Sequence, residues 1–155
     1  MNDSETAAGI AAIEIEIEIN APREEVWRVM FEETNQWWIP EFRVVGVNSK
    51  ITFDPIAGGK GILEEVDDGS WLKWYEVQMY LPADFKVFLF GHVAPEWGGP
   101  TTSNMKISLE ESESGCVFRL SDARHGNVGP GDTQSFEDGW RQLFTDGLKK
   151  YVESK

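Results

Sequence analysis

Cysteine and histidine are scarce in this sequence, which argues against disulfide frameworks and metal centres. The 155 residues contain one cysteine, Cys116, so no disulfide can form within the chain. The two histidines, His92 and His125, do not stand at a metal-ligand spacing such as HxxxH, and Cys116 has no partner thiol. A site built on both histidines would need a carboxylate such as Asp122 or Glu76 nearby in space. We expect neither a metal nor another cofactor.

Positive charge is also scarce. Fourteen Lys and Arg against 27 Asp and Glu give a net charge of −13. The sequence shows no basic patch, so a nucleic-acid backbone or an anionic membrane would be repelled. No apolar run approaches the ~20 residues of a membrane helix, and the first residues lack the basic start and long apolar core of a signal peptide. We expect a cytoplasmic protein without nucleic-acid partners or membrane insertion.

The common catalytic and nucleotide-binding fingerprints are missing as well. The sequence contains no nucleophile elbow, no P-loop and no dinucleotide-binding glycine pattern. The glycine-rich stretch 58–61 lacks the spacing of a phosphate loop, and a hairpin bulge explains it better.

Aromatic residues, in contrast, are abundant. The chain has 9 Phe, 7 Trp and 3 Tyr, and a single core rarely needs so many large rings. Some of them are expected to line a cavity or a surface groove. The alternative is a core that is simply rich in tryptophan.

The clearest strand signal lies in residues 13–19, where four isoleucines alternate with three glutamates. This period of two predicts an antiparallel strand with one buried face. Residues 1–10 before it are interpreted as a flexible lead-in. Pro22 suits the first position of a short helix, and Thr34 is expected to cap a second short helix that Pro40 ends.

Six further strands are expected before the last helix. Turn signals such as Asp67-Asp68-Gly69 separate alternating apolar segments. Alternation does not decide which face of the segment 71–80 points inward, because both faces carry aromatic residues. The predicted strands cover residues 49–54, 60–66, 71–80, 85–93, 101–109 and 116–122.

A long C-terminal helix is the best-specified helix of the chain. Ser135, with Asp138 three residues later, resembles a capping box. Apolar residues recur at helical spacing from Phe136 to Tyr151. A strand, two short helices, a run of strands and one helix predict an α+β fold, with a curved antiparallel sheet of six to seven strands around this helix. Residues 11–155 are expected to form a single domain.

Several motifs resemble a known superfamily. The segment 21–27 (APREEVW) after an alternating strand resembles the opening of SRPBCC or START-like proteins. The pairs Trp37-Trp38, Gly58-Gly59 and Gly139-Trp140 resemble homologues of the activator of the heat-shock-protein-90 ATPase. The resemblance covers about residues 12 to 152.

The resemblance implies the helix-grip fold of the birch-pollen-allergen type, with a pocket between the sheet and the last helix. Members of the superfamily include lipid and hormone carriers, polyketide cyclases and co-chaperone domains, so the fold does not settle function. No additional N-terminal domain for engaging a large chaperone is visible, which argues against direct activation of a chaperone ATPase and makes a chaperone partner the least favoured of the possible partners.

The aromatic residues of the strands and helices are our candidates for ligand contacts. The alternative is that these rings only pack on one another. The candidates are Trp37, Trp38 and Phe42 near the short helices, Phe53, Trp74, Phe88, Phe90 and Phe118 on strands, and Trp140 and Phe144 on the last helix.

Three residues are candidates for acid–base chemistry. His125 and Arg124 follow the last predicted strand, where a histidine could transfer protons and an arginine could hold a carboxylate or oxyanion. Glu76 would have a raised pKa if it faced an aromatic cavity. The alternative is that all three are solvated surface residues.

Three functions follow as hypotheses. The first is the binding of a small apolar or aromatic molecule in the grip. The second is an acid–base enzyme of the cyclase, hydratase or hydrolase type in the same cavity. The third is a stress-related co-chaperone. Trp97, in a loop, is expected to lie on the pocket rim or in a homodimer contact.

Overall fold

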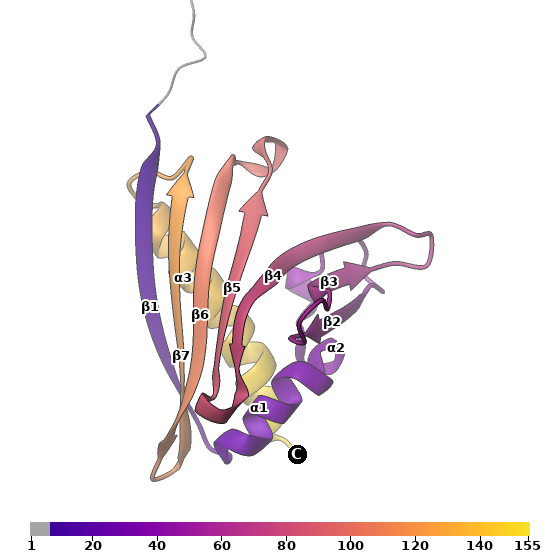
Figure 1. The fold of residues 1–155 in the computed structure, drawn as a ribbon, viewed down its shortest axis with the longest axis vertical. Helices are drawn as coiled ribbons and strands as arrows, with labels where there is room; N and C mark the ends of the chain where they lie inside the picture. The colour runs from indigo at the N-terminus through magenta and orange to yellow at the C-terminus, as the bar shows by residue number, and fades with distance from the viewer. Residues whose placement is uncertain (1–6) are drawn as a thin grey trace, which may run out of the picture.

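The computed structural model describes residues 7–155, and an antiparallel sheet dominates it (Figure 1). The seven strands are β1 (Gly9–Ile19), β2 (Lys50–Asp54), β3 (Gly61–Glu65), β4 (Trp71–Leu81), β5 (Lys86–Val93), β6 (Thr101–Ser112) and β7 (Gly115–Gly126). Their order in the sheet is β1-β7-β6-β5-β4-β3-β2, so each strand from β2 to β6 pairs with its successor along the chain, and β1 pairs with β7. This confirms the predicted α+β helix-grip fold.

The alternating pattern of β1 is explained by its position. Its isoleucines from Ile13 to Ile19 are buried against the helix side, and the intervening glutamates are exposed. The strand begins at Gly9, so the last two residues of the expected lead-in belong to the sheet. Residues 1–6 of that lead-in lie outside the described residues.

Two short helices cover one end of the sheet, as predicted. They are α1 (Arg23–Glu32) and α2 (Thr34–Trp37), followed by the short 3₁₀ turn η1 (Pro40–Phe42). Thr34 does not cap α2, because its hydroxyl donates back to the carbonyls of Met30 (2.8 Å) and Phe31 (3.1 Å). A threonine inside a turn of helix often bonds in this way.

The C-terminal helix crosses the concave face of the sheet. It consists of α3 (Asp132–Gln142), the wider π-helical segment η4 (Leu143–Lys149) and α4 (Lys150–Glu153), without a break. The expected cap at Ser135 is wrong by four residues, because the N-cap is Gly131. Gly131, with φ 100°, turns the chain into the helix, and the Asp132 carboxylate accepts a hydrogen bond from the Gly129 amide (2.7 Å). Glycine is the residue best suited to that left-handed backbone.

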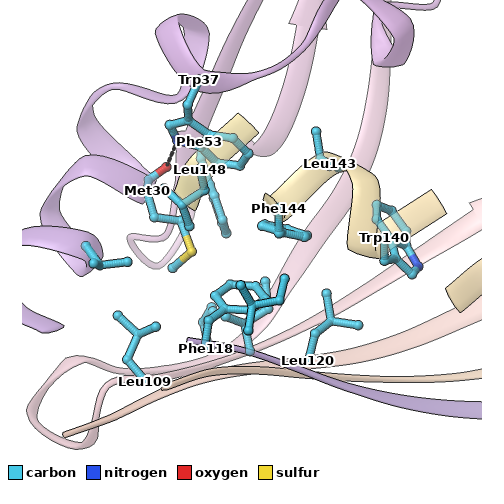
Figure 2. Packing of buried hydrophobic residues seen from close by; sticks show 14 of the residues in the cluster. Met30, Trp37, Phe53, Leu109, Phe118, Leu120, Trp140, Leu143, Phe144 and Leu148 are labelled. Carbon is cyan, nitrogen blue, oxygen red and sulfur yellow. Dashed lines mark hydrogen bonds between the residues drawn. The ribbon is translucent and has the colours of Figure 1, made fainter. Parts of the chain in front are cut away.

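Large side chains fill the end of the grip that α1 and α2 cover. Figure 2 shows Phe144 of the C-terminal helix above Phe118 of β7, and their ring centroids lie 4.6 Å apart. Trp37 packs on Phe144 at 5.6 Å and donates from its indole to the Met30 carbonyl. Burying each such ring contributes about 1.5–3 kcal/mol to stability.

Strand β4 bends from the β5 side of the sheet to the β3 side, as Figure 1 shows, and its pairing shifts twice. Tyr75 pairs with Ile62 whereas Lys73 pairs with Leu63, so Trp74 is an extra residue on β4. A bulge breaks the strict alternation of faces. Trp74 and its neighbour Tyr75 therefore both reach the interior. The question of which alternating face of residues 71–80 points inward has no single answer, because the bulge brings residues of both faces to the same side.

No helix within residues 7–155 is long and apolar enough to cross a bilayer. The cytoplasmic location stays a prediction.

Candidate ligand-binding site

A cavity of about 370 Å³ lies between the first half of the C-terminal helix and strands β4 to β7. This volume falls in the range of small-molecule sites, about 300–1,000 Å³. The cavity lies at the end of the grip opposite α1, where the phenylalanine-rich core stops. Its wall comprises Phe42, Val44, Leu72, Lys73, Trp74, Tyr75, Gly91, His92, Val93, Trp97, Ser103, Arg124, Ser135, Phe136, Gly139 and Trp140.

Aromatic rings form a connected wall in this cavity. Phe42 stacks on Trp74 with a centroid distance of 6.4 Å, and Phe42 lies equally far from Trp140. Trp140 in turn lies 6.0 Å from Tyr75. These distances are typical of interacting aromatic pairs. The wall offers flat apolar surfaces on several sides of a guest molecule.

A buried carboxylate organises the polar part of the site. Asp122 of β7 is 2% exposed and accepts three hydrogen bonds, from Ser103 Oγ (2.7 Å), Arg124 Nε (2.8 Å) and Trp140 Nε1 (2.9 Å). Tyr75 Oη lies 2.5 Å from Ser103 Oγ. Buried charge is tolerated only when it is paired and hydrogen-bonded in this way. The network fixes the orientation of three cavity-lining side chains, Trp140, Arg124 and Ser103.

The phenol of Tyr75 is held neutral by its surroundings. Burial raises the pKa of Tyr75 above its usual range, and the negative charge of Asp122 raises it further. The hydroxyl of Ser103 and the charge of Arg124 act in the opposite direction and are outweighed. At neutral pH Tyr75 is therefore a hydrogen-bonding phenol and not a general base.

A second buried carboxylate supports the opposite wall. Glu64 of β3 is fully buried and accepts hydrogen bonds from Trp74 Nε1 (3.0 Å), the Val44 and Val45 amides (3.1 and 3.0 Å) and Ser49 Oγ (2.8 Å). Burial acts to raise the pKa of Glu64, but these hydrogen bonds, with that of Trp74 the largest, lower it below its usual value. Glu64 thereby holds Trp74 and Val44 in the cavity wall.

Arg124 completes the site. Its guanidinium lies over the Phe136 ring at 3.9 Å and 5.8 Å from the Trp140 centroid. Both rings belong to α3, so the arginine joins β7 to the helix across the cavity edge. Stacking of this kind fixes the plane of the guanidinium.

The family of this chain follows from a sequence match that covers most of its length. A family model described as Activator of Hsp90 ATPase homolog 1-like protein matches residues 20–153. The chain belongs to this family. The resemblance noted in the sequence is confirmed.

Solved structures share the fold of this family member at low sequence identity. An uncharacterised protein from Rhizobium leguminosarum aligns with a TM-score of 0.69 and 16% identity, over 96% of this chain and 98% of that chain. The protein Ara h 8.0201 aligns with a TM-score of 0.66 and 18% identity, over 95% of this chain and 100% of that chain. Protein MLL2253 from Mesorhizobium loti aligns at 0.64 and 19%, over 93% and 98%. None of the curated proteins matches the chain.

The ten aromatic candidates separate into three groups in this family member. Phe42, Trp74 and Trp140 line the cavity. Phe88 and Phe90 of β5 lie on the outer face of the sheet, with Phe90 36% exposed, so they do not reach the cavity. The others, Trp37, Trp38, Phe53, Phe118 and Phe144, belong to the buried core.

Only one of the three acid–base candidates lies in the cavity. Strand β7 continues to Gly126, so Arg124 and His125 are consecutive strand residues with opposite orientations. Arg124 lines the cavity, and His125 is exposed on the outer face. Glu76 is 46% exposed and pairs with Lys73 at 2.9 Å. The enzyme hypothesis as built on Glu76 and His125 therefore lacks both groups inside the cavity.

Sequence reasoning missed Tyr75, Ser103 and Asp122 as site residues. A signal for two of them was present. Ser103 occupies the same strand phase as Met105 and Ile107, and Asp122 the same phase as Phe118 and Leu120. A polar residue at an apolar phase marks a buried polar contact. No group of three or more potential metal ligands is found within residues 7–155.

Proposed function

We propose that the chain binds a small apolar or aromatic molecule in this cavity. The observation that carries the proposal is an aromatic-walled space of about 370 Å³ that the chain's own side chains leave open. A ligand that buried ~200 Å² of apolar surface there would gain on the order of 5 kcal/mol before the costs of binding.

A neutral fluorescent probe tests this proposal. N-phenyl-1-naphthylamine is aromatic, uncharged and emits strongly when it leaves water. We expect saturable binding with a 1:1 stoichiometry. Gly139 offers the site for a blocking substitution, because a Cβ there would meet only Phe42 Cζ, at 3.9 Å. The longer side chain of Gly139→Leu would occupy the cavity.

The expected result is a loss of probe affinity of about tenfold or more in Gly139→Leu. Gln142→Leu, an exposed position on the same helix, is the matched control and should retain the affinity. Equal binding to both variants, or no saturable binding to the unmodified chain, would refute the proposal.

A second candidate function, that of a co-chaperone, rests on the family assignment. It predicts that the chain changes the ATPase rate of a purified Hsp90-type chaperone. The two rings on the outer face of β5, the partly buried Phe88 and the exposed Phe90, are the positions to test by substitution with serine. An unchanged ATPase rate at saturating chain concentration would exclude direct activation.

A further inference from the structure

The charges on the cavity wall are unlike those of the rest of the chain. The charged residues that line it are Lys73 and Arg124, both basic, and no Asp or Glu within residues 7–155 contributes to the wall. In the whole sequence acidic residues outnumber basic ones by 27 to 14. The two carboxylates behind the wall, Asp122 and Glu64, are almost completely buried by their own hydrogen-bond donors. A guest molecule therefore meets positive charge only.

Arg124 presents hydrogen-bond donors that its protein partners leave free. Its side chain is 13% exposed, and its Nε donates to Asp122. Within residues 7–155 the Tyr75 hydroxyl also interacts with the guanidinium, but one phenol oxygen takes up only part of the terminal N–H groups, and the others are left for a guest. Stacking on Phe136 and the bond to Asp122 hold the guanidinium in place. A preformed guanidinium fork with free donors matches the two oxygens of a carboxylate or sulfonate.

Asp122 does not compete for these donors. Its two oxygens already accept from Ser103, Arg124 and Trp140, and its side chain is fully buried in the ion pair. Asp122 fixes Arg124 from behind, while the other side of the guanidinium faces the cavity. A cationic guest, in contrast, would find no exposed counter-charge on the wall.

The second cation of the wall is differently placed. Lys73 already has a partner in Glu76, at 2.9 Å, and Glu76 is half exposed to solvent. Exposed pairs of this kind contribute little and are screened by salt. Arg124 is the cation in the drier surroundings, so its interaction with a guest is the stronger one.

We propose that the natural ligand carries an anionic group, a carboxylate or a sulfonate-like group, that pairs with Arg124. The apolar part of the same molecule lies against Phe42 and Trp74. This inference rests on the proposed function and adds the chemical class of the ligand.

Two probes of the same skeleton separate the apolar from the anionic contribution. 1-Anilinonaphthalene-8-sulfonate is N-phenyl-1-naphthylamine with a sulfonate added. The readout is the ratio of the two affinities, in which effects on the apolar cavity cancel. For the unmodified chain we expect the sulfonate probe to bind about tenfold more tightly, despite the chain's net charge of −13.

Arg124→Met should remove this preference and bring the ratio close to one. Arg124→Lys keeps the charge without the fork and should retain part of the preference. Lys150→Met, an exposed residue of α4, makes the same change of net charge and should leave the ratio unchanged. If Arg124→Met does not fold, as judged by circular dichroism, the affinity ratio of the unmodified chain and its reduction in Arg124→Lys still test the inference.

Three other outcomes would each contradict one of the two proposals. Binding of the neutral probe without a preference for the sulfonate would overturn this inference and leave the apolar site intact. Loss of the preference in Lys73→Met in place of Arg124→Met would also overturn it, because the anion would then lie at Lys73. If neither probe binds, the proposed function itself is refuted.

Discussion

At the scale of single residues, two buried carboxylates hold the cavity open. Asp122 fixes Trp140 and Arg124 on one side, and Glu64 fixes Trp74 and the backbone of Val44 on the other. Each carboxylate has all its oxygens bonded to donors from different elements. Neither faces the guest, so their contribution is to position the residues that do.

Replacement of Glu64 should destabilise the chain by about 2–3 kcal/mol at neutral pH. In Glu64→Gln an amide NH₂ group faces donors in place of an acceptor oxygen. Urea unfolding at pH 7 measures the loss. Glu65→Gln, the next residue along β3, is partly exposed and should change stability by less than about 0.5 kcal/mol.

The effect of Glu64 should also depend on pH. The pKa of Glu64 is lowered in the folded chain, so its charge stabilises the fold above the unfolded-state pKa, and this stabilisation is lost as pH falls. The difference in unfolding free energy between the unmodified chain and Glu64→Gln should therefore shrink as the pH is taken from 7 to below about 4. A difference independent of pH would show that the charge does not contribute.

At the scale of elements, the C-terminal helix has two glycines with different tasks. Gly147, in the π-helical segment η4, lets the helix approach Trp37 so closely that a Cβ would lie 2.5 Å from the Trp37 carbonyl oxygen. Gly139, two turns earlier, faces the cavity and has space around it. Close approach at one end and space at the other follow from the same helix lying obliquely on the sheet.

The two positions should respond in opposite ways to alanine. Gly147→Ala should cost about 1–3 kcal/mol, because backbone atoms would have to move apart. Gly139→Ala should stabilise the helix by about 0.5–1 kcal/mol, since alanine is the better helix former and its methyl group has room. Thermal unfolding of both variants is the measurement. The same sign of change at both sites would contradict this account of the packing.

At the scale of the whole molecule, the helix grip divides into a filled end and an open end. The filled end, around Phe118 and Phe144, provides the core that stabilises the fold. The open end is bounded by walls from β4 to β7, η1 and α3. A ligand there contacts elements far apart in the sequence, so its binding should stabilise the fold as a whole.

Ligand binding should therefore raise the melting temperature. At a free concentration of N-phenyl-1-naphthylamine 100 times its dissociation constant, the gain is about 2.7 kcal/mol. For a chain of this size that corresponds to a rise of about 5–10 °C. Differential scanning calorimetry is the measurement. Gly139→Leu should show almost no rise at the same concentration, and an equal rise would contradict binding in the cavity.

The excess of negative charge should also affect the whole fold. A net charge of −13 on 155 residues opposes the compact state by self-repulsion. Raising sodium chloride from about 20 to 300 mM shortens the screening length several-fold, so the melting temperature should rise. A fall in melting temperature over this range would indicate that attractive pairs, and not repulsion, dominate the electrostatics.

The sequence by itself determined the fold class and almost all of its elements. The alternation in β1 and the apolar stripe of the last helix are local patterns, and burial of one face is their direct physical consequence. The family resemblance in segment 21–27 and in the paired tryptophans was also readable. The first turn of the last helix was predicted wrongly at Ser135, because the left-handed backbone of Gly131 was not visible in the pattern.

Tertiary structure alone decided the site. The extra residue in β4 brought Trp74 and Tyr75 to the same side, and the length of β7 placed Arg124 inside and His125 outside. Both outcomes depend on strand register, which is set by pairing with distant segments and not by local composition. For the same reason the sequence named the aromatic residues but could not tell those that fill the core from those that line the cavity.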